Sequence, residues 1–257
     1  MLLKAKKSLG QHFLVNKQIA SRIVQAMPVE GYQYLAEVGP GRGALTEHFI
    51  NFKDKNIILI ETDDDLIPAL VRAYPHFTVL HTDFLNHSLA TLSGGKPMGV
   101  IGNFPYNISS QIVFKLIDEP VVVCAVGMFQ KEMAERIYSK PGTKVYGIIS
   151  VFAQALFDIE YLFTVSPGNF YPPPKVNSAV LKFQRKTSPH PFARHRAFIK
   201  IVKTSFNQRR KMLRNTLKTF YPETLLSQQD IFSRRPESLS LEEFYFLTQM
   251  HLDSYEP

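Results

Sequence analysis

The sequence has one cysteine, Cys124, and no uninterrupted apolar run near the roughly 18 residues that a membrane-spanning helix needs. A single cysteine excludes a disulfide framework, and its place within "VVVCAVG" predicts a buried strand residue. The first residues, "MLLKAKKSLGQHF", lack the apolar core of a secretory signal, and no spacing of cysteine and histidine indicates a metal site. We therefore expect a cytoplasmic protein with no membrane segment and no bound metal.

Acidic residues are absent from two segments of this chain, whose net charge is +8. Residues 1–29 carry only basic charges, at Lys4, Lys6, Lys7, Lys17 and Arg22. Residues 194–218 carry nine lysines and arginines, among them Lys203, Arg209, Arg210, Lys211 and Arg214. Clustered cations favour a polyanion, because binding releases counterions from its phosphates. The two segments therefore predict a nucleic-acid partner; the alternative is a solvated helix face, which usually mixes both signs of charge.

Apolar runs and helical stretches alternate between residues 34 and 128. The runs are "YLAEVG", "NIILIE", "FTVLHTD", "MGVIGN" and "VVVCAVGMF", and the stretches between them include "ALTEHFI", "DDLIPALVRAY" and "SSQIVFKLI". This alternation predicts an α/β fold made of βαβ units with a parallel sheet. Two further helices are expected at "KEMAERIYS" and "GIISVFAQA", and then two antiparallel strands at "FDIEYLFTV" and "NSAVLKFQR".

The composition changes at residues 186–193, "KTSPHPFA", which resemble a linker. Everything beyond them is predicted to be helical, because apolar side chains recur at helical spacing. These side chains are Phe198, Ile201, Val202 and Phe206, then Met212, Leu213, Leu217 and Phe220, and finally Phe244, Phe246 and Leu247. We therefore expect two domains, residues 1–186 and residues 187–257.

A glycine-rich segment, "EVGPGRGALTE", places Gly39, Gly41 and Gly43 between a predicted strand and a predicted helix. Glycines at this point let the backbone approach a ligand closely. The segment alone is ambiguous, because Gly39, Gly41 and Ala44 also match the dinucleotide fingerprint, and a simple tight turn would need similar residues.

Polar side chains end the next three predicted strands. Glu61 follows Gly41 by twenty residues, where a carboxylate can accept hydrogen bonds from both ribose hydroxyls, and Asp83 could accept from the exocyclic amine of an adenine. Asn103 ends the fourth strand. The carboxyl ends of parallel strands meet at one edge, so these residues are expected to share a site. The neighbouring residues 63–65, all aspartates, are interpreted as turn and helix-capping residues.

Five motifs in order over nearly the whole chain resemble one known family. The motifs are "KKSLGQHFLVN", "EVGPGRGALT", "GNFPYNISS", "NFYPPPKVNSAV" and "FNQRRKMLRN". The chain resembles the KsgA/Dim family of ribosomal RNA adenine N6-dimethyltransferases. This resemblance implies a Rossmann-like class I methyltransferase domain, a small all-helical C-terminal domain that binds RNA, and S-adenosyl-L-methionine as methyl donor. It also implies dimethylation of two adjacent adenosines near the 3′ end of 16S rRNA in the small ribosomal subunit.

The resemblance also implies which residues line the methyl-donor pocket: His12, Leu14, Gly39, Gly41, Glu61, Asp83 and Asn103. His12 departs from the family pattern, which more often has asparagine at this position. An imidazole can still donate one hydrogen bond, so the pocket is compatible with His12.

The segment "NFPY", Asn103 to Tyr106, suits the chemistry of adenine N6, whose lone pair is delocalised into the ring. The side-chain carbonyl of Asn103 and the backbone carbonyl of Phe104 can each accept a hydrogen bond from one N6–H group and so localise that lone pair. Pro105 stiffens the loop, and Tyr106 offers a face on which a flipped base can stack. Phe170 is expected to stack on the opposite face of the base, as in the family; alternatively, it is a core anchor of its hairpin.

Other functions remain open at this point. The related erythromycin-resistance enzymes modify an adenine of 23S rRNA, and a DNA adenine methyltransferase would carry a different proline motif. A non-catalytic ribosome assembly factor with the same fold would not need Glu61, Asp83 and Asn103. A dehydrogenase would satisfy the glycine fingerprint, but Asp83 and the lack of a hydride-transfer partner argue against it. A monomer is the expected oligomeric state.

Overall fold

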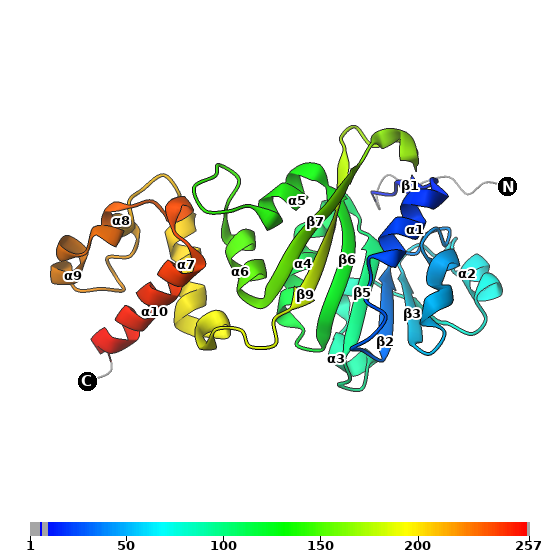
Figure 1. Ribbon diagram of the computed structural model, residues 1–257, viewed down its shortest axis with the longest axis horizontal. Coiled ribbons are helices and arrows are strands. Elements are labelled where there is room, and N and C mark those ends of the chain that lie inside the picture. The colour runs from blue at the N-terminus through cyan, green and yellow to red at the C-terminus, as the bar shows by residue number, and fades with distance from the viewer. Residues whose placement is uncertain (1–5, 7–9, 256–257) are drawn as a thin grey trace. The chain divides into compact units, whose positions relative to one another are not determined.

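A computed structural model of the chain describes Lys6 and residues 10–255 (Figure 1). The chain divides into two compact units: Met1–Ala134 with Asp158–Arg185, and Glu135–Phe157 with Lys186–Pro257. The predicted boundary after residue 186 lies within one residue of the point where the chain passes from the first unit to the second, between Arg185 and Lys186. Residues 135–157, which the sequence assigned to the first domain, belong to the second unit. The reason is packing, since the ring of Phe152 meets that of Phe198 edge-on, with 5.9 Å between centroids.

The first unit is built on a seven-stranded sheet in the order β4-β3-β2-β5-β6-β9-β7 (Figure 1). Its strands are β2 (Tyr34–Val38), β3 (Asn56–Glu61), β4 (Thr78–His81), β5 (Met98–Asn103), β6 (Val122–Gln130), β7 (Phe157–Val165) and β9 (Ser178–Arg185). Strands β2 to β6 are all parallel to one another, and β9 runs antiparallel to β6. The predicted α/β fold with a parallel sheet is confirmed, and Cys124 is a buried residue of β6, as expected.

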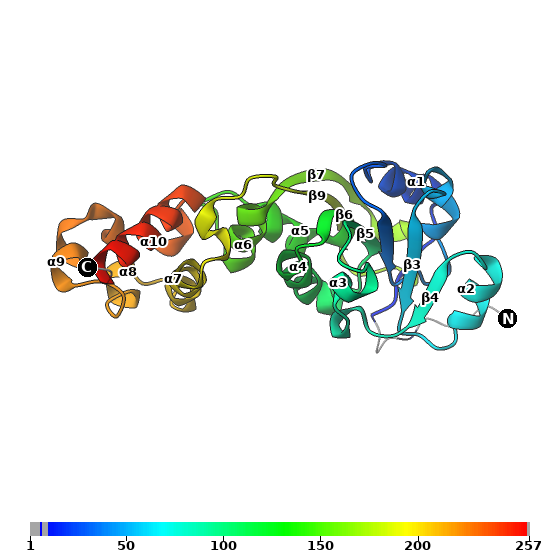
Figure 2. The ribbon, with the colours of Figure 1, turned by 90° about the horizontal axis from the view of Figure 1, so that it is seen from below.

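Helices lie on both faces of this sheet, as Figure 2 shows for α1 and α4. The helices of the first unit are α1 (Lys17–Gln25), α2 (Ile67–Ala73), α3 (Leu89–Leu92) and α4 (Ser109–Asp118), and α5 (Lys131–Tyr138) begins in the first unit and ends in the second. Helix α1 begins where the side chain of Asn16 accepts hydrogen bonds from two backbone N–H groups of the first turn. Its buried side chains belong to a core cluster that also contains Leu35, Leu59, Ile101 and Val126 of the sheet. Fully burying one such side chain stabilises the fold by roughly 1.5–3 kcal/mol.

The segment after the glycines differs from the prediction. A helix was expected over residues 44–50, but the chain forms a 3₁₀ helix at Thr46–Phe52 with non-helical backbone angles at Phe49. One cause is that the Thr46 hydroxyl donates to the carboxyl of Glu37 at 2.7 Å, which ties the turn to the end of β2.

A second, two-stranded sheet was not predicted. Strand β1 (Phe13–Leu14) pairs antiparallel with β8 (Phe170–Tyr171), so that Phe13 lies opposite Tyr171 and Leu14 opposite Phe170. Two-residue strands carry too little periodicity to be recognised in a sequence. This pair brings the N-terminal segment and the proline-rich loop together.

The second unit is helical, as predicted. Its elements are α6 (Ile148–Leu156), α7 (Arg196–Asn207), α8 (Leu213–Thr216), α9 (Glu223–Gln228) and α10 (Leu241–Tyr255). The helix expected through Met212 and Phe220 is much shorter: the chain turns after α7, and α8 spans four residues. Met212 therefore lies outside the core and is 37% exposed. Among the described residues, no helix is long and apolar enough to cross a membrane.

Candidate active site

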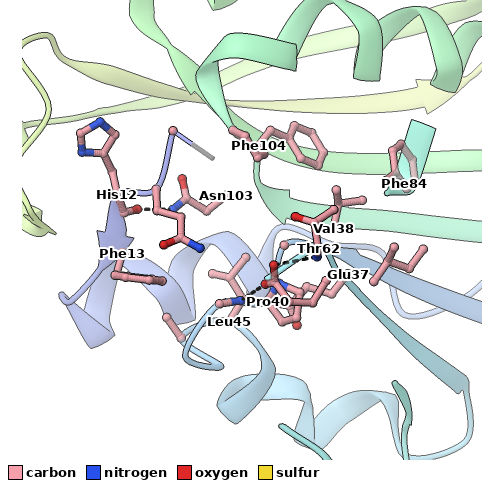
Figure 3. A pocket seen from close by; sticks show the side chains of 18 of the residues that line it. His12, Phe13, Glu37, Val38, Pro40, Leu45, Thr62, Phe84, Asn103 and Phe104 are labelled. Atoms are coloured by element: carbon pink, nitrogen blue, oxygen red, sulfur yellow. Dashed lines mark hydrogen bonds between the residues drawn. The ribbon is translucent and has the colours of Figure 1, made fainter. Parts of the chain in front are cut away.

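A pocket opens at the carboxyl ends of β2, β3 and β5, with a volume of about 910 Å³ including its open mouth (Figure 3). All the residues predicted to hold a methyl donor line it: His12, Leu14, Gly39, Gly41, Glu61, Asp83 and Asn103. Phe104, Pro105 and Tyr106 line it too. The structure therefore brings ten of the eleven residues predicted for donor and target base to one pocket.

The glycine loop forms the floor next to β2. Gly39 has φ of +65°, a conformation that L side chains rarely adopt, and a Cβ added there would meet no protein atom within 4 Å. At Gly41, with φ of +58°, a Cβ would come within 3.2 Å of the Phe13 ring. Gly39 thus leaves space that a ligand can fill, and Gly41 lets β1 approach.

Glu61, at the end of β3, holds this loop in place. One carboxylate oxygen accepts from the N–H of Gly41 at 3.0 Å, and the other accepts from the N–H groups of Thr62 and Asp63 at 2.9 and 3.0 Å. Glu61 is 5% exposed. Burial raises its pKa, and the three backbone N–H groups oppose that shift because they favour the charged form. Glu61 therefore stabilises the loop, in addition to any contact it makes with a ligand.

Asp83 begins a short 3₁₀ helix, Phe84–Asn86, and one of its carboxylate oxygens accepts from the N–H of Leu85 at 2.9 Å. The side chain is only partly buried and lines the pocket. Its second oxygen is an acceptor of the kind that an exocyclic amine needs.

Glu37 was overlooked in the sequence, although an acid within the apolar run "YLAEV" is unusual. It lines the pocket, is 1% exposed, and accepts a hydrogen bond from Thr46. Burial, followed by repulsion from Glu61, raises the pKa of Glu37 to about 8, against the bond from Thr46. The Glu37 carboxyl therefore carries a proton at neutral pH.

Asp63 and its two neighbours form a turn, as predicted, but the residue preceding α2 is Leu66 and none of the three caps that helix. The three carboxylates lie close enough together to hold a cation. The ammonium of Lys6 lies among them, at 2.5, 2.9 and 2.7 Å from Asp63, Asp64 and Asp65. A hydrogen bond of 2.6 Å from Gln11 to Asp63 also ties the pocket-lining N-terminal segment to this turn.

Asn103 is oriented by the N-terminal segment. Its amide nitrogen donates to the backbone carbonyl of His12 at 2.8 Å (Figure 3). This bond turns the amide nitrogen toward His12 and fixes the side chain, whose carbonyl oxygen is the acceptor that can act on a substrate. An oriented acceptor at a strand end is what the proposed localisation of an amine lone pair requires.

Phe104 and Pro105 stiffen the loop that follows. The Phe104 ring is 1% exposed and fills the space above Gly127, where an added Cβ would come within 2.1 Å of it. Its backbone N–H donates to Met128 at 3.2 Å, and no described residue donates to its carbonyl. The Pro105 carbonyl accepts from the hydroxyl of Ser109 at 3.1 Å. The ring therefore anchors the loop and leaves the Phe104 carbonyl available.

Tyr106 and His12 form one side of the pocket. Their rings stack with centroids 5.5 Å apart and an angle of 27°. The Tyr106 hydroxyl hydrogen-bonds the Ser178 hydroxyl at 2.6 Å, and His12 Nδ1 donates to the Pro172 carbonyl at 2.8 Å. This bond places a proton on Nδ1. His12 thus links three segments, in addition to holding Asn103 through its main chain.

Comparison with known proteins decides the family. Residues 2–233 match the family model for ribosomal RNA adenine dimethylase. The ribosomal RNA small subunit methyltransferase A of Flavobacterium johnsoniae is 47% identical over 250 residues, covering 96% of this chain and 95% of the relative. The chain belongs to the ribosomal RNA adenine dimethylase family.

Solved structures agree with the fold of a dimethylase. A dimethyladenosine transferase from Plasmodium falciparum has a TM-score of 0.80 at 24% identity, covering 94% of this chain and 98% of that one. The 23S rRNA methyltransferase ErmE has a TM-score of 0.71 at 24% identity, covering 94% and 99%. These likenesses show the Rossmann-like methyltransferase fold that the resemblance implied.

The dimethylase family uses S-adenosylmethionine, and the pocket fits this donor. Carboxylates at Glu61 and Asp83 match its ribose hydroxyls and adenine amine, and the space beside Gly39 is not filled by any side chain. Asn103 lies at the same edge, where a base and the donor can meet.

Phe170 is not part of this pocket. It is 3% exposed, belongs to the core cluster beneath α1, and pairs through its backbone with Leu14. In this arrangement its ring presents no face to a base, and the alternative, a core anchor, describes its position. Alternation along β8 turns the next side chain, Tyr171, outward.

The predicted RNA-binding cations lie in the second unit. Lys203, Arg210, Lys211 and Arg214 are exposed. Arg209 is tied down instead: its guanidinium donates to the Thr143 carbonyl at 3.2 Å and lies 3.9 Å from the carboxylate of Glu237. Residues 194–218 contain no acid, but Arg209 of this segment therefore lies near the carboxylate of Glu237, which is distant in the sequence. Lys4 and Lys7 lie outside the described residues.

Proposed function

We propose that this chain transfers methyl groups from S-adenosylmethionine to N6 of two adjacent adenosines near the 3′ end of 16S rRNA, in the small ribosomal subunit. The family membership and the near-complete coverage of small-subunit relatives support this assignment. The observation that carries the chemistry is the hydrogen bond of 2.8 Å from the Asn103 amide to the His12 carbonyl, because it aims an acceptor at the donor pocket.

The residues of the chain act by orientation. The Asn103 side-chain oxygen and the Phe104 carbonyl each accept a hydrogen bond from one of the two N–H groups of adenine N6. These two hydrogen bonds localise the lone pair of N6. S-adenosylmethionine supplies the electrophilic methyl group when bound. Tyr106 holds the flipped base against the pocket wall, since its ring is fixed by Ser178 and His12. Catalysis then rests on positioning and on preorganised dipoles, and the product ammonium loses its proton to water.

The first unit is proposed to carry the reaction, and the exposed cations of the second unit are proposed to bind rRNA phosphates. We also propose that the protein acts as a monomer in the cytoplasm. The assignment of RNA binding to the second unit rests on the basic segments and on the family. The monomer is proposed because the pocket by itself does not require a second subunit.

Mass spectrometry of rRNA from cells with and without this gene tests the proposal. Loss of dimethyladenosine from 16S rRNA, with 23S rRNA unchanged, is the expected result. A change confined to 23S rRNA would favour the erythromycin-resistance type, whose fold ErmE shares with this chain. Unchanged rRNA, together with binding of the protein to small-subunit particles, would favour a non-catalytic assembly factor.

A further inference from the structure

Strand β8, which pairs with the pocket-lining strand β1, carries an exposed aromatic side chain that the reaction does not use. Tyr171 is 60% exposed, although its neighbour Phe170 is buried at 3%. The cause is the pairing of β1 with β8, which sets Phe13 opposite Tyr171 and turns alternate side chains to opposite sides. An exposed aromatic ring on a paired strand is positioned by its backbone rather than by contacts of its own.

The contacts of its neighbours place Tyr171 beside the pocket. Its strand partner Phe13 lines the pocket. The carbonyl of the next residue, Pro172, accepts the hydrogen bond from His12, whose ring stacks on Tyr106. Tyr171 therefore directly precedes a residue that is hydrogen-bonded to His12, part of the wall against which the target base is proposed to rest.

The backbone around Tyr171 is held on both sides. Before it, the Asn169 carbonyl accepts from the N–H of Val15 at 2.9 Å, and the Asn169 side chain accepts from Asn16 at 2.8 Å. After it come three prolines, residues 172–174. A ring presented by a stiff backbone loses little conformational freedom when it binds.

The surroundings suit an anionic partner with flat bases. No aspartate or glutamate occurs in residues 10–29 or 161–185, the segments that supply β1 and β8. Lys175, four residues after Tyr171, is exposed, and the exposed apolar side chains Val15 and Val176 lie on the same two segments. An aromatic face on segments that carry cations and no acids is typical of surfaces that bind unpaired nucleotides.

We propose that Tyr171 is a stacking platform for the nucleotide adjacent to the target adenine, which holds this neighbour outside the pocket while the target is inside. The inference rests on the proposed function, which has two adjacent adenosines as substrates. Tyr171 is then a positioning residue for the RNA, and the hydroxyl is dispensable because the ring face makes the contact.

Single-turnover methyl transfer to small-subunit particles, measured against particle concentration, tests this role. Tyr171→Ala should raise the half-saturating particle concentration about tenfold, as expected for one lost base stack, with an unchanged rate at saturation. Tyr171→Phe should stay within about twofold of wild type. Ile50→Ala is the matched control, since Ile50 is 67% exposed in the same unit and does not line the pocket.

The control outcomes separate the alternatives. Equal behaviour of Tyr171→Ala and Ile50→Ala would overturn the inference while leaving the proposed function intact, whereas a wild-type protein without transfer would refute the proposed function itself. A Tyr171→Phe variant as weak as Tyr171→Ala would also overturn it. Weaker binding to particles but not to protein-free 16S rRNA would assign the ring to a ribosomal protein instead.

A photoreactive benzoylphenylalanine at position 171 gives an independent measurement. Its cross-links to rRNA should map to the nucleotide next to the methylated adenine. Cross-links confined to distant nucleotides or to proteins would contradict the platform.

Discussion

Replacing Asn103 by alanine removes two interactions at once. The variant loses the side-chain acceptor that is proposed to bind adenine N6, and it loses the hydrogen bond of 2.8 Å to the His12 carbonyl. The second loss releases the N-terminal segment from the end of β5. The magnitude of each loss can be worked out separately.

The loss of one preorganised polar contact to a reacting group typically lowers the rate by about 10²–10³. The loss of the bond to His12 should lower the free energy of unfolding by about 1 kcal/mol, the usual net value for a neutral hydrogen bond. We therefore expect a folded Asn103→Ala variant whose chemical step is slower by two to three orders of magnitude, on the order of the effect of one oxyanion-hole donor.

The assay is single-turnover transfer of labelled methyl groups at saturating S-adenosylmethionine and saturating particles, with urea unfolding in parallel. Asn86→Ala makes the same chemical change at an exposed site that does not line the pocket, and it should leave the rate unchanged. Transfer by Asn103→Ala at the wild-type rate would show that "NFPY" is only a turn. A rate loss that matches the unfolded fraction would refute the assigned role equally.

Three further predictions concern the donor pocket and the basic surface. Glu61→Ala should weaken S-adenosylmethionine binding by about 1.5–3 kcal/mol, as for charged hydrogen bonds. It should also lower the melting temperature, because three backbone N–H groups lose their acceptor. An unchanged affinity measured by calorimetry would show that Glu61 is not part of the donor site. The pKa of Glu37 is raised to about 8, so the folded state keeps a proton that the unfolded chain releases; stability should fall between about pH 4.5 and 8, by roughly 4–5 kcal/mol at most. Glu37→Gln should flatten this slope relative to wild type in urea titrations, and parallel curves would contradict the assignment. Reversing Lys203, Arg210 and Lys211 to glutamate should weaken particle binding and reduce its salt slope by about one unit per lost phosphate contact, with donor affinity unchanged; wild-type binding at every salt concentration would identify a solvated face.

The residues of the donor pocket were largely predictable from the sequence. Glu61, Asp83 and Asn103 each end an apolar run, and the ends of parallel strands meet at one edge whatever the helices between them do. The glycine loop is equally local, because positive φ at Gly39 and Gly41 depends on the absence of a side chain. Such features follow from spacing along the chain, and the structure places them where the spacing predicts.

Only the tertiary structure decided the features that depend on contacts between distant segments. The bond from Asn103 to His12 joins residues 91 positions apart, and the two-residue pair of β1 and β8 buries Phe170 while it exposes Tyr171. The protonated state of Glu37 likewise depends on burial, which a sequence does not display. Local patterns report which face of a strand or helix is apolar, whereas the partner of that face is chosen by the packing of the whole unit.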